Sequence, residues 1–167
     1  MMKIRKTHAE NINIIMNIYD DAKLFMTETG NGNQWINGYP SRELIMDDIS
    51  KGNSYVCIDD NDETVGTFCF IRGDDPTYSV IYDGKWLNDD PYGVIHRLAG
   101  RRNSRGIAAA CLQWCFEQCG NIRVDTHRDN IVMQNILMKN GFIRCGTVII
   151  ANGTERIAFQ RTVNREQ

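Results

Sequence analysis

One short segment restricts the fold of this chain more than any other. Between Tyr92 and Ala108, an apolar strand-like run leads into an arginine-rich loop, and a helix-forming run begins at Ile107. A strand joined through a short loop to a helix is typical of sheets in which strands and helices alternate. We therefore expect a central strand here, followed by a helix that packs on the sheet.

The loop in this segment has the character of an anion-binding site. Four arginines, Arg97, Arg101, Arg102 and Arg105, lie close together in a chain whose net charge is only −2. At the start of the following helix, backbone N–H groups lack intrahelical acceptors and the helix dipole is positive. Gly106 has no side chain that would keep an anion away from them. The pattern predicts a phosphorylated small ligand rather than a long polyanion.

Length and composition limit the function classes. With 167 residues, the chain is most simply one domain, residues 1–167. A pI near 5.9 argues against a nucleic-acid partner. We find no signal peptide and no apolar run of the roughly 20 residues that a membrane span needs. We therefore expect a cytoplasmic protein without a membrane partner.

The six cysteines form no C-x-x-C pair. Cys111, Cys115 and Cys119 repeat every four residues, which places them along one face of a helix. They could form a metal or redox cluster, or they could fill a buried helix face as small apolar side chains. We favour the second interpretation because Ala108 and Leu112 share that face and no histidine accompanies them. The sequence therefore gives no support for a metal site.

Periodic apolar residues predict the remaining elements. A Thr7–Glu10 capping box opens the first helix, and an Asn152-Gly153 type I′ turn closes a final hairpin. The predicted elements are a strand at Lys3–Arg5, helices after Thr7 and after Ser41, strands at Ser54–Ile58, Val65–Ile71, Tyr78–Tyr82 and Ile122–Thr126, helices at Ile107–Cys119 and from Asp129 or Asn130 to Lys139, and hairpin strands at Phe142–Ile150 and Arg156–Gln160. This order predicts an α/β fold, a mixed sheet with helices on both faces.

A second motif lies further along the chain. Residues Asp125–Asn130 read D-T-H-R-D-N at a predicted strand–helix junction, and Gly141-Phe142 follows that helix. With the element order of nearly the whole chain, this motif resembles the GNAT superfamily of N-acetyltransferases, whose central sheet is mostly antiparallel. The main family motif, [QR]-x-x-G-x-[GA], corresponds to Arg101–Gly106, where Ser104 replaces the first glycine.

The resemblance implies acetyl-CoA as the co-substrate, bound at the arginine-rich loop. The CoA pyrophosphate would lie on backbone N–H groups of the loop and helix start, and the pantetheine arm would pair with the end of the central strand. Asn130 would hydrogen-bond the pantetheine or CoA, with a plain helix cap as the alternative. The implied cofactor-binding residues are Leu98, Ala99, Gly100, Arg101, Arg102, Asn103, Ser104, Arg105, Gly106, Ile107, Ala108 and Asn130.

The implied reaction is attack of an amine on the thioester carbonyl, which needs a base for the amine and a donor for the oxyanion. His96 is our first choice as the base, because an unperturbed imidazole has a pKa of about 6.5. The alternative for His96 is a buried core residue. Strand alternation puts His96 on one face with Val94 and Leu98. A backbone N–H near Leu98 or Ala99 would serve the oxyanion.

Asp125 and His127 share the strand of the second motif and are the fallback candidates for the base, acting through water. The alternative for Asp125 is an ion pair with Arg123 or Arg97. Many members of the family carry a tyrosine as general acid near the end of the following helix, and Leu137 takes that position here. Leucine cannot donate a proton, so either water protonates the thiolate or the thiolate leaves without a proton.

Aromatic residues mark the candidate acceptor pocket. Trp35 and Tyr39 lie among turn residues, and Tyr78 and Trp86 lie in an aspartate-rich segment. Aromatic rings together with acids suit a cationic amine. The alternative is that Trp35 and Tyr39 hold a loop while the aspartates are solvated turn residues.

These patterns predict an acetyltransferase whose acceptor is an amine of a small molecule or a peptide. The rival hypothesis is a non-catalytic acyl-CoA-binding regulatory module of the same fold, suggested by Ser104 and Leu137. The closing hairpin offers an edge strand for a homodimer.

Overall fold

A computed structural model describes residues 2–163, so the predicted domain ends at 1 and 167 lie outside it. The strands are β1 (Lys3–Lys6), β2 (Ser54–Ile58), β3 (Thr64–Arg72), β4 (Gly93–Gly100), β5 (Asn121–Thr126), β6 (Ile143–Ile149) and β7 (Glu155–Thr162). The helices are α1 (Ile12–Glu28), α2 (Arg42–Ser50), α3 (Ile107–Cys119) and α4 (Ile131–Lys139), with short 3₁₀ turns η1 (Ala9–Asn11) and η2 (Pro76–Ser79).

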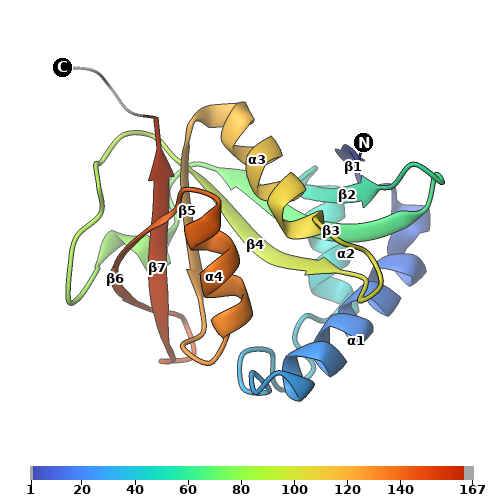
Figure 1. Ribbon diagram of the computed structural model, residues 1–167, viewed down its shortest axis with the longest axis horizontal. Helices are drawn as coiled ribbons and strands as arrows, with labels where there is room; N and C mark the ends of the chain where they lie inside the picture. The colour runs from blue at the N-terminus through green and yellow to red at the C-terminus, as the bar shows by residue number, and fades with distance from the viewer. Residues whose placement is uncertain (1, 164–167) are drawn as a thin grey trace.

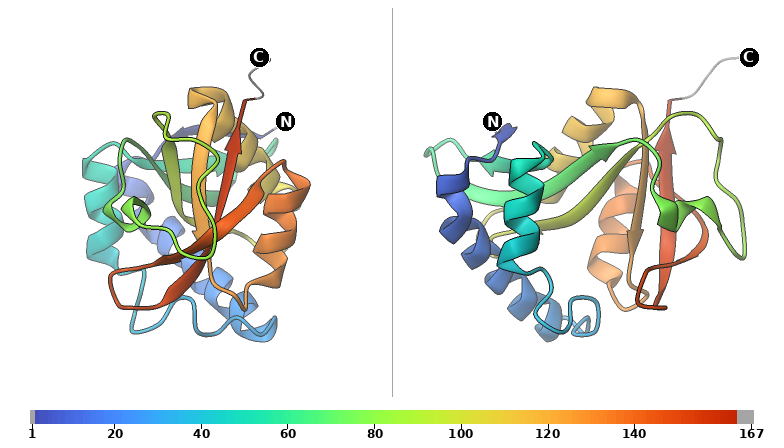
Figure 2. Two further views of the ribbon diagram at one scale, coloured as in Figure 1. Left: turned by 90° about the vertical axis from the view of Figure 1, so that its left-hand side faces the viewer. Right: turned by 180° about the vertical axis from the view of Figure 1, so that it is seen from behind.

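The strands form one sheet in the order β1-β2-β3-β4-β5-β7-β6 (Figure 1). Within the described part of the chain, β4 and β5 are parallel and the other neighbouring strands are antiparallel. Helices α3 and α4 cover one face of the sheet, and α1 and α2 cover the other (Figure 2). The predicted fold class, a mixed and mostly antiparallel sheet between helices, is confirmed.

The centre of the sheet is opened between β4 and β5. These strands pair only at Gly93 with Ile122 and at Val94 with Arg123, and beyond these positions they diverge (Figure 1). The carboxyl ends of the two strands therefore leave a wedge-shaped gap. In open α/β sheets, ligands bind outside the carboxyl ends of neighbouring parallel strands.

A β-bulge interrupts β4 at the edge of this gap. His96 pairs with Cys69 and Ala99 pairs with Thr67, so that Arg97 and Leu98 lie opposite a single residue of β3. The extra residue shifts the alternation of side chains beyond it. Leu98 packs with the core cluster on the α3 and α4 side, so the predicted common face of His96 and Leu98 is wrong.

The start of α3 lies very close to the sheet. Gly66 of β3 pairs with Gly100 of β4, and a methyl group added to Gly66 would come within 2.5 Å of Ile107. The absence of side chains at these two glycines lets the first turn of α3 rest on the sheet. Cys111 and Cys115 of α3 are fully buried in the core, which confirms the packing interpretation of the cysteine repeat.

Three local predictions are wrong, each because a tertiary contact or turn geometry replaces the local pattern. Thr7 does not cap the first helix, since its hydroxyl hydrogen-bonds Ser54, and the helix starts after His8. The predicted strand at Tyr78–Tyr82 is replaced by the turn η2 and an isolated bridge at Tyr82. The final hairpin has a three-residue loop with Gly153 alone at positive φ, which excludes a type I′ turn.

Candidate active site

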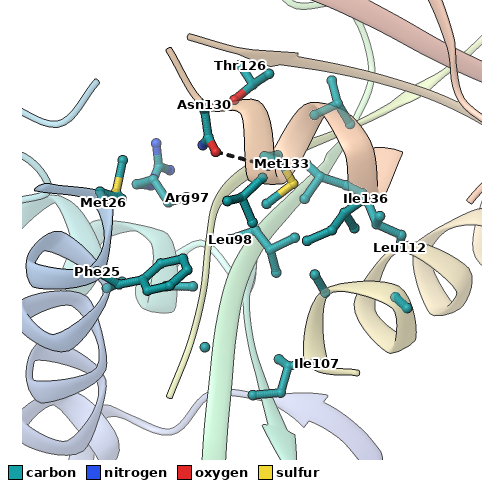
Figure 3. Close-up of a pocket in the computed structure, with 18 of the residues that line it drawn as sticks. Phe25, Met26, Arg97, Leu98, Ile107, Leu112, Thr126, Asn130, Met133 and Ile136 are labelled. Atoms are coloured by element: carbon teal, nitrogen blue, oxygen red, sulfur yellow. Dashed lines mark hydrogen bonds between the residues drawn. The ribbon is translucent and has the colours of Figure 1, made fainter. Parts of the chain in front are cut away.

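A cavity of about 500 Å³ lies in the gap between β4 and β5, a size typical of small-molecule sites. Its walls come from α1, the end of β4, the start of α3, β5 and α4 (Figure 3). Ten of the twelve predicted cofactor residues line it: Leu98, Ala99, Gly100, Arg101, Arg102, Ser104, Gly106, Ile107, Ala108 and Asn130. The other two, Asn103 and Arg105, belong to the same loop but do not line the cavity.

The arginine-rich loop enters α3 through Gly106, which caps the helix at φ +74°. Ile107, Ala108 and Ala109 of the first turn of α3 line the cavity. Their N–H groups have no intrahelical carbonyl to which they could donate a hydrogen bond. This end of the cavity therefore offers backbone donors and the positive end of a helix dipole to an anion.

The loop is also tied to α1 and β3 by its own polar groups. The Arg102 backbone N–H donates to the carboxylate of Asp21 at 3.1 Å, and the Arg102 side chain forms an ion pair with Glu28. Arg101 donates from Nε to the Thr64 carbonyl at 3.1 Å. These contacts define the loop geometry and leave the donors at the start of α3 as the stronger candidates for an anion.

Asn130 is a helix cap, one of the two roles that the sequence left open. Its Oδ1 accepts the Met133 N–H at 3.0 Å and so caps α4. Its Nδ2 donates to Gln34 Oε1 at 2.9 Å across the rim of the cavity. The side chain is therefore a helix cap that also lines the cavity, with its amide nitrogen bonded to Gln34 (Figure 3).

Gln34 is a site residue that the sequence reasoning missed. Its Oε1 accepts hydrogen bonds from Asn31 and Asn130, both at 2.9 Å, and its carbonyl accepts one from Arg156 at 3.1 Å. Gln34 thereby joins the segment between α1 and α2 to α4 and β7. The one signal in the sequence is that Gln34 lies next to Trp35 and near Tyr39, and this position does not indicate which residues Gln34 contacts.

Asp125, a residue of β5, also lines the cavity. Its Oδ2 accepts a 2.6 Å hydrogen bond from the hydroxyl of Tyr78, which replaces the ion pair with Arg123 or Arg97 considered from the sequence. Burial raises the pKa of Asp125, while the Tyr78 hydrogen bond opposes the rise. A carboxylate with a raised pKa is a stronger proton acceptor than an ordinary aspartate.

His96, the first choice for the base, does not line the cavity. Its Nε2 lies 3.2 Å from a carboxylate oxygen of Asp75, and this hydrogen bond is the main reason that the pKa of Asp75 is lowered. Ile95 and Val124 pack in the core cluster on the α3 and α4 side, so their strand neighbours His96 and Asp125 both point to the other face of the sheet. His127 is largely buried, and its Nδ1 accepts the Asp129 backbone N–H at 3.0 Å.

The predicted acceptor aromatics separate into two groups. Trp35 lines the cavity, and its ring packs edge-on against Tyr19 and Tyr39. Tyr39 lies behind Trp35 and accepts a 3.0 Å hydrogen bond from Arg97.

Tyr78 and Trp86 do not line the cavity, and Trp86 contacts a cation of its own chain instead. The Arg123 guanidinium stacks on the rings of Trp86 and Tyr92, 4.2 and 4.1 Å from their centroids. Tyr78 is only 2% exposed and reaches the site through its hydroxyl. The Trp86 ring is therefore already covered by internal packing, away from this cavity.

The position of the family's tyrosine is closed to proton transfer. Leu137 is fully buried in the core cluster between α4 and the sheet.

Within residues 2–163, no three side chains of His, Cys, Asp or Glu come together as metal ligands. None of the helices described has the length and apolar character needed to cross a bilayer.

Comparisons with known proteins agree on the architecture. The sequence matches no protein-family model and no curated protein. A GNAT-family acetyltransferase from Streptococcus agalactiae 2603 has a TM-score of 0.89 and 35% identity, with 98% of this chain and 96% of that chain covered. A putative acetyltransferase from Staphylococcus aureus MU50 has a TM-score of 0.70 and 23% identity, with coverages of 96% and 99%.

A more distant structure shares the fold alone. The NatC complex bound to Gag peptide and CoA has a TM-score of 0.57 and 14% identity, with 98% of this chain and 99% of that chain covered. The likeness to the Streptococcus structure is much stronger and extends over nearly the full length of both chains. With the split β4–β5 pair and the loop at the start of α3, this identity shows that the chain belongs to the GNAT family of acetyltransferases.

Proposed function

We propose that this acetyltransferase moves an acetyl group from acetyl-CoA to a primary amine by direct attack on the thioester. One observation carries the proposal: the same cavity is lined by the first turn of α3, whose N–H groups lack intrahelical acceptors, and by Asp125. The first feature suits the phosphates of CoA, and the second suits an amine that must lose a proton.

We assign the CoA end to the loop and the first turn of α3. The donors with no competing acceptor are the N–H groups of Ile107 and Ala108, with the Ser104 hydroxyl beside them. Leu98–Gly100 would pair with the pantetheine arm, and Asn130 would donate to it. The NatC neighbour, which carries CoA on the same fold, supports this end of the assignment.

We assign the base to Asp125, acting directly or through one water. Asp125 takes a proton from the ammonium form of the acceptor, and the free amine attacks the acetyl carbonyl. The pKa of Asp125 is already raised by burial, which suits this task. His96 becomes a supporting residue, because it is paired with Asp75 and does not line the cavity.

The oxyanion and the leaving group need separate donors. A backbone N–H at the β4 bulge, at Leu98 or Ala99, would stabilise the oxyanion as it forms. The nitrogen of the tetrahedral intermediate loses its extra proton to water, and the departing CoA thiolate takes its proton from water, since the buried Leu137 has none to give.

We assign the acceptor end to Trp35 and to the loop that contains Tyr39. Trp35 presents an aromatic ring to the cavity, and aromatic rings attract cationic amines. The acceptor is then the amine of a small molecule or a peptide that passes Trp35 to reach Asp125.

Thermal unfolding tests the cofactor first. Acetyl-CoA at ~100 times its Kd adds about 2.7 kcal/mol of stability, which raises the Tm of a domain this size by roughly 5–10 °C. Adenosine bisphosphate and ATP are the controls. No shift with acetyl-CoA would contradict the proposal.

A second measurement separates the enzyme from the binding module. Amines are added to protein and acetyl-CoA, and the release of free CoA is followed. Faster release with an amine supports catalysis, whereas a thermal shift with no amine-dependent release across the amine set would favour the non-catalytic acyl-CoA-binding module.

A further inference from the structure

The bulge in β4 has an unusual residue at its centre. Arg97 has φ +54°, in the left-handed region that glycine, asparagine and aspartate occupy more readily. No local property of arginine favours this conformation. The contacts around Arg97 must therefore hold it there.

Both the backbone and the side chain of Arg97 are held. The hydroxyl of Tyr19, a buried residue of α1, donates to the Arg97 carbonyl at 2.8 Å. The guanidinium donates from Nη2 to both carboxylate oxygens of Asp48 at 2.8 and 2.7 Å, and from Nε to Oδ2 at 3.0 Å. Nη1 donates to the Tyr39 hydroxyl at 3.0 Å. We call these four residues, Arg97, Asp48, Tyr39 and Tyr19, the Arg97 clamp.

The clamp is largely shielded from water. The side chains of Arg97 and Asp48 are only 10% and 8% exposed. A bidentate arginine–carboxylate pair restricts orientation as well as distance, and its burial weakens screening by solvent and salt. Its members come from α1, α2, β4 and the Tyr39 loop, so the clamp joins four separate segments to one residue of the bulge.

The position of the clamp relates it to catalysis. Arg97 and Leu98 both line the cavity, and Figure 3 shows them on β4 between the α1 side chains and α4. The Leu98 N–H follows directly on the left-handed residue, so its direction depends on the Arg97 torsion angles. Tyr39 also packs against Trp35, so the clamp touches the proposed acceptor end.

We propose that Arg97 is a positioning residue, which fixes the β4 bulge through Asp48, Tyr39 and Tyr19 and thereby aims the backbone donor used in acetyl transfer. The inference rests on the proposed function for its catalytic meaning. Its structural content, a bulge held by the clamp, is independent of the reaction.

The experiment compares Asp48→Asn with Asp47→Asn. Asp47 is the neighbouring residue on α2 and has its own ion pair, with Lys51 at 2.8 Å, but that pair is exposed to solvent. We expect Asp48→Asn to lower kcat about 10- to 100-fold, the effect of a misplaced donor. The KM for acetyl-CoA should change far less, and Asp47→Asn should behave as the wild type.

The loss of kcat without a matching change in KM is the readout that a merely structural role would not produce, and amide hydrogen exchange tests separately whether the clamp holds the bulge. We expect exchange at Leu98 and Ala99 to become faster in Asp48→Asn, with β5 unaffected. Tyr39→Phe, which removes one hydroxyl from a partly exposed ring, provides a milder variant if Asp48→Asn does not fold. Its expected effects have the same pattern and smaller size.

Equal exchange rates in Asp48→Asn and Asp47→Asn would overturn the inference. So would an active wild type whose kcat is unchanged by Asp48→Asn. If the wild type transfers no acetyl group to any amine, the proposed function is overturned, and the exchange rates alone then decide whether the clamp holds the bulge.

Discussion

The two ends of the cavity are built in different ways. The proposed CoA end is made from one continuous stretch, Leu98–Ala108, and mainly from its backbone. The proposed acceptor end is held together by contacts between residues that are far apart in sequence. Tyr78 and Asp125 are separated by 47 residues, Asp48 and Arg97 by 49, and Gln34 and Arg156 by 122.

This difference has a physical reason. Phosphates of CoA need backbone N–H groups and a helix dipole, which a short loop at a helix start supplies by itself. Proton transfer needs a carboxylate whose pKa depends on burial and on hydrogen-bonding partners. Those partners approach Asp125 only when η2 packs over the sheet. The proposed CoA end therefore depends on residues that are neighbours in sequence, and the proposed acceptor end depends on tertiary contacts.

The largest expected effect tests the acceptor end. Asp125→Asn removes the proposed base at almost constant volume, so kcat/KM should fall about 10²- to 10⁴-fold. Acetyl-CoA affinity, measured by calorimetry, should stay near the wild-type value because the CoA end is separate. Asp74→Asn, an exposed change in the η2 segment, is the control. Wild-type kcat/KM in Asp125→Asn would remove Asp125 from the mechanism.

A pair of tryptophan changes separates substrate contact from internal packing. Trp35→Leu should raise the acceptor KM about tenfold, the loss of one well-packed aromatic contact. Trp86→Leu should lower the free energy of unfolding by about 2 kcal/mol, because it uncovers the Arg123 guanidinium. Steady-state kinetics and urea unfolding measure the two effects. A reversed result would move the acceptor to the Trp86 side of the molecule.

The CoA end should be sensitive to the approach of α3 to the sheet. In Gly66→Ala the new methyl group meets Ile107, so the first turn of α3 must shift. Overpacking of about 1–3 kcal/mol should weaken acetyl-CoA binding by roughly tenfold. Gly32→Ala, whose methyl group would make only an ordinary contact, is the control. Unchanged acetyl-CoA affinity in Gly66→Ala would argue against the α3 assignment.

The smallest expected effect is a shift along the pH axis. The Tyr78 hydroxyl stabilises the charged form of Asp125, so Tyr78→Phe should raise the pKa of Asp125 further. Since the base must be deprotonated, the acid limb of the kcat/KM profile should move to higher pH, by about one unit or less. A limb that stays in place or moves to lower pH would show that another group titrates.

Most of the fold was predictable from local sequence. The apolar runs predicted β2 and α3 at their observed bounds, and the helix predicted after Ser41 begins at Arg42 as α2. The predictions failed where long-range contacts or turn geometry decide, as at Thr7, which hydrogen-bonds Ser54, and at η2. Periodicity also could not show the bulge at Arg97, because one inserted residue leaves the apolar pattern of a short strand almost unchanged.

The sequence by itself determined the family, the strand–loop–helix unit and most of the residues that line the cavity at the proposed CoA end, because these depend on neighbours along the chain. Only the tertiary structure decided which of two candidate bases lines the cavity. It turned His96 toward Asp75, paired Asp125 with Tyr78 and locked Arg97 to Asp48. Each of these choices depends on the distance between atoms far apart in sequence, and packing alone sets that distance.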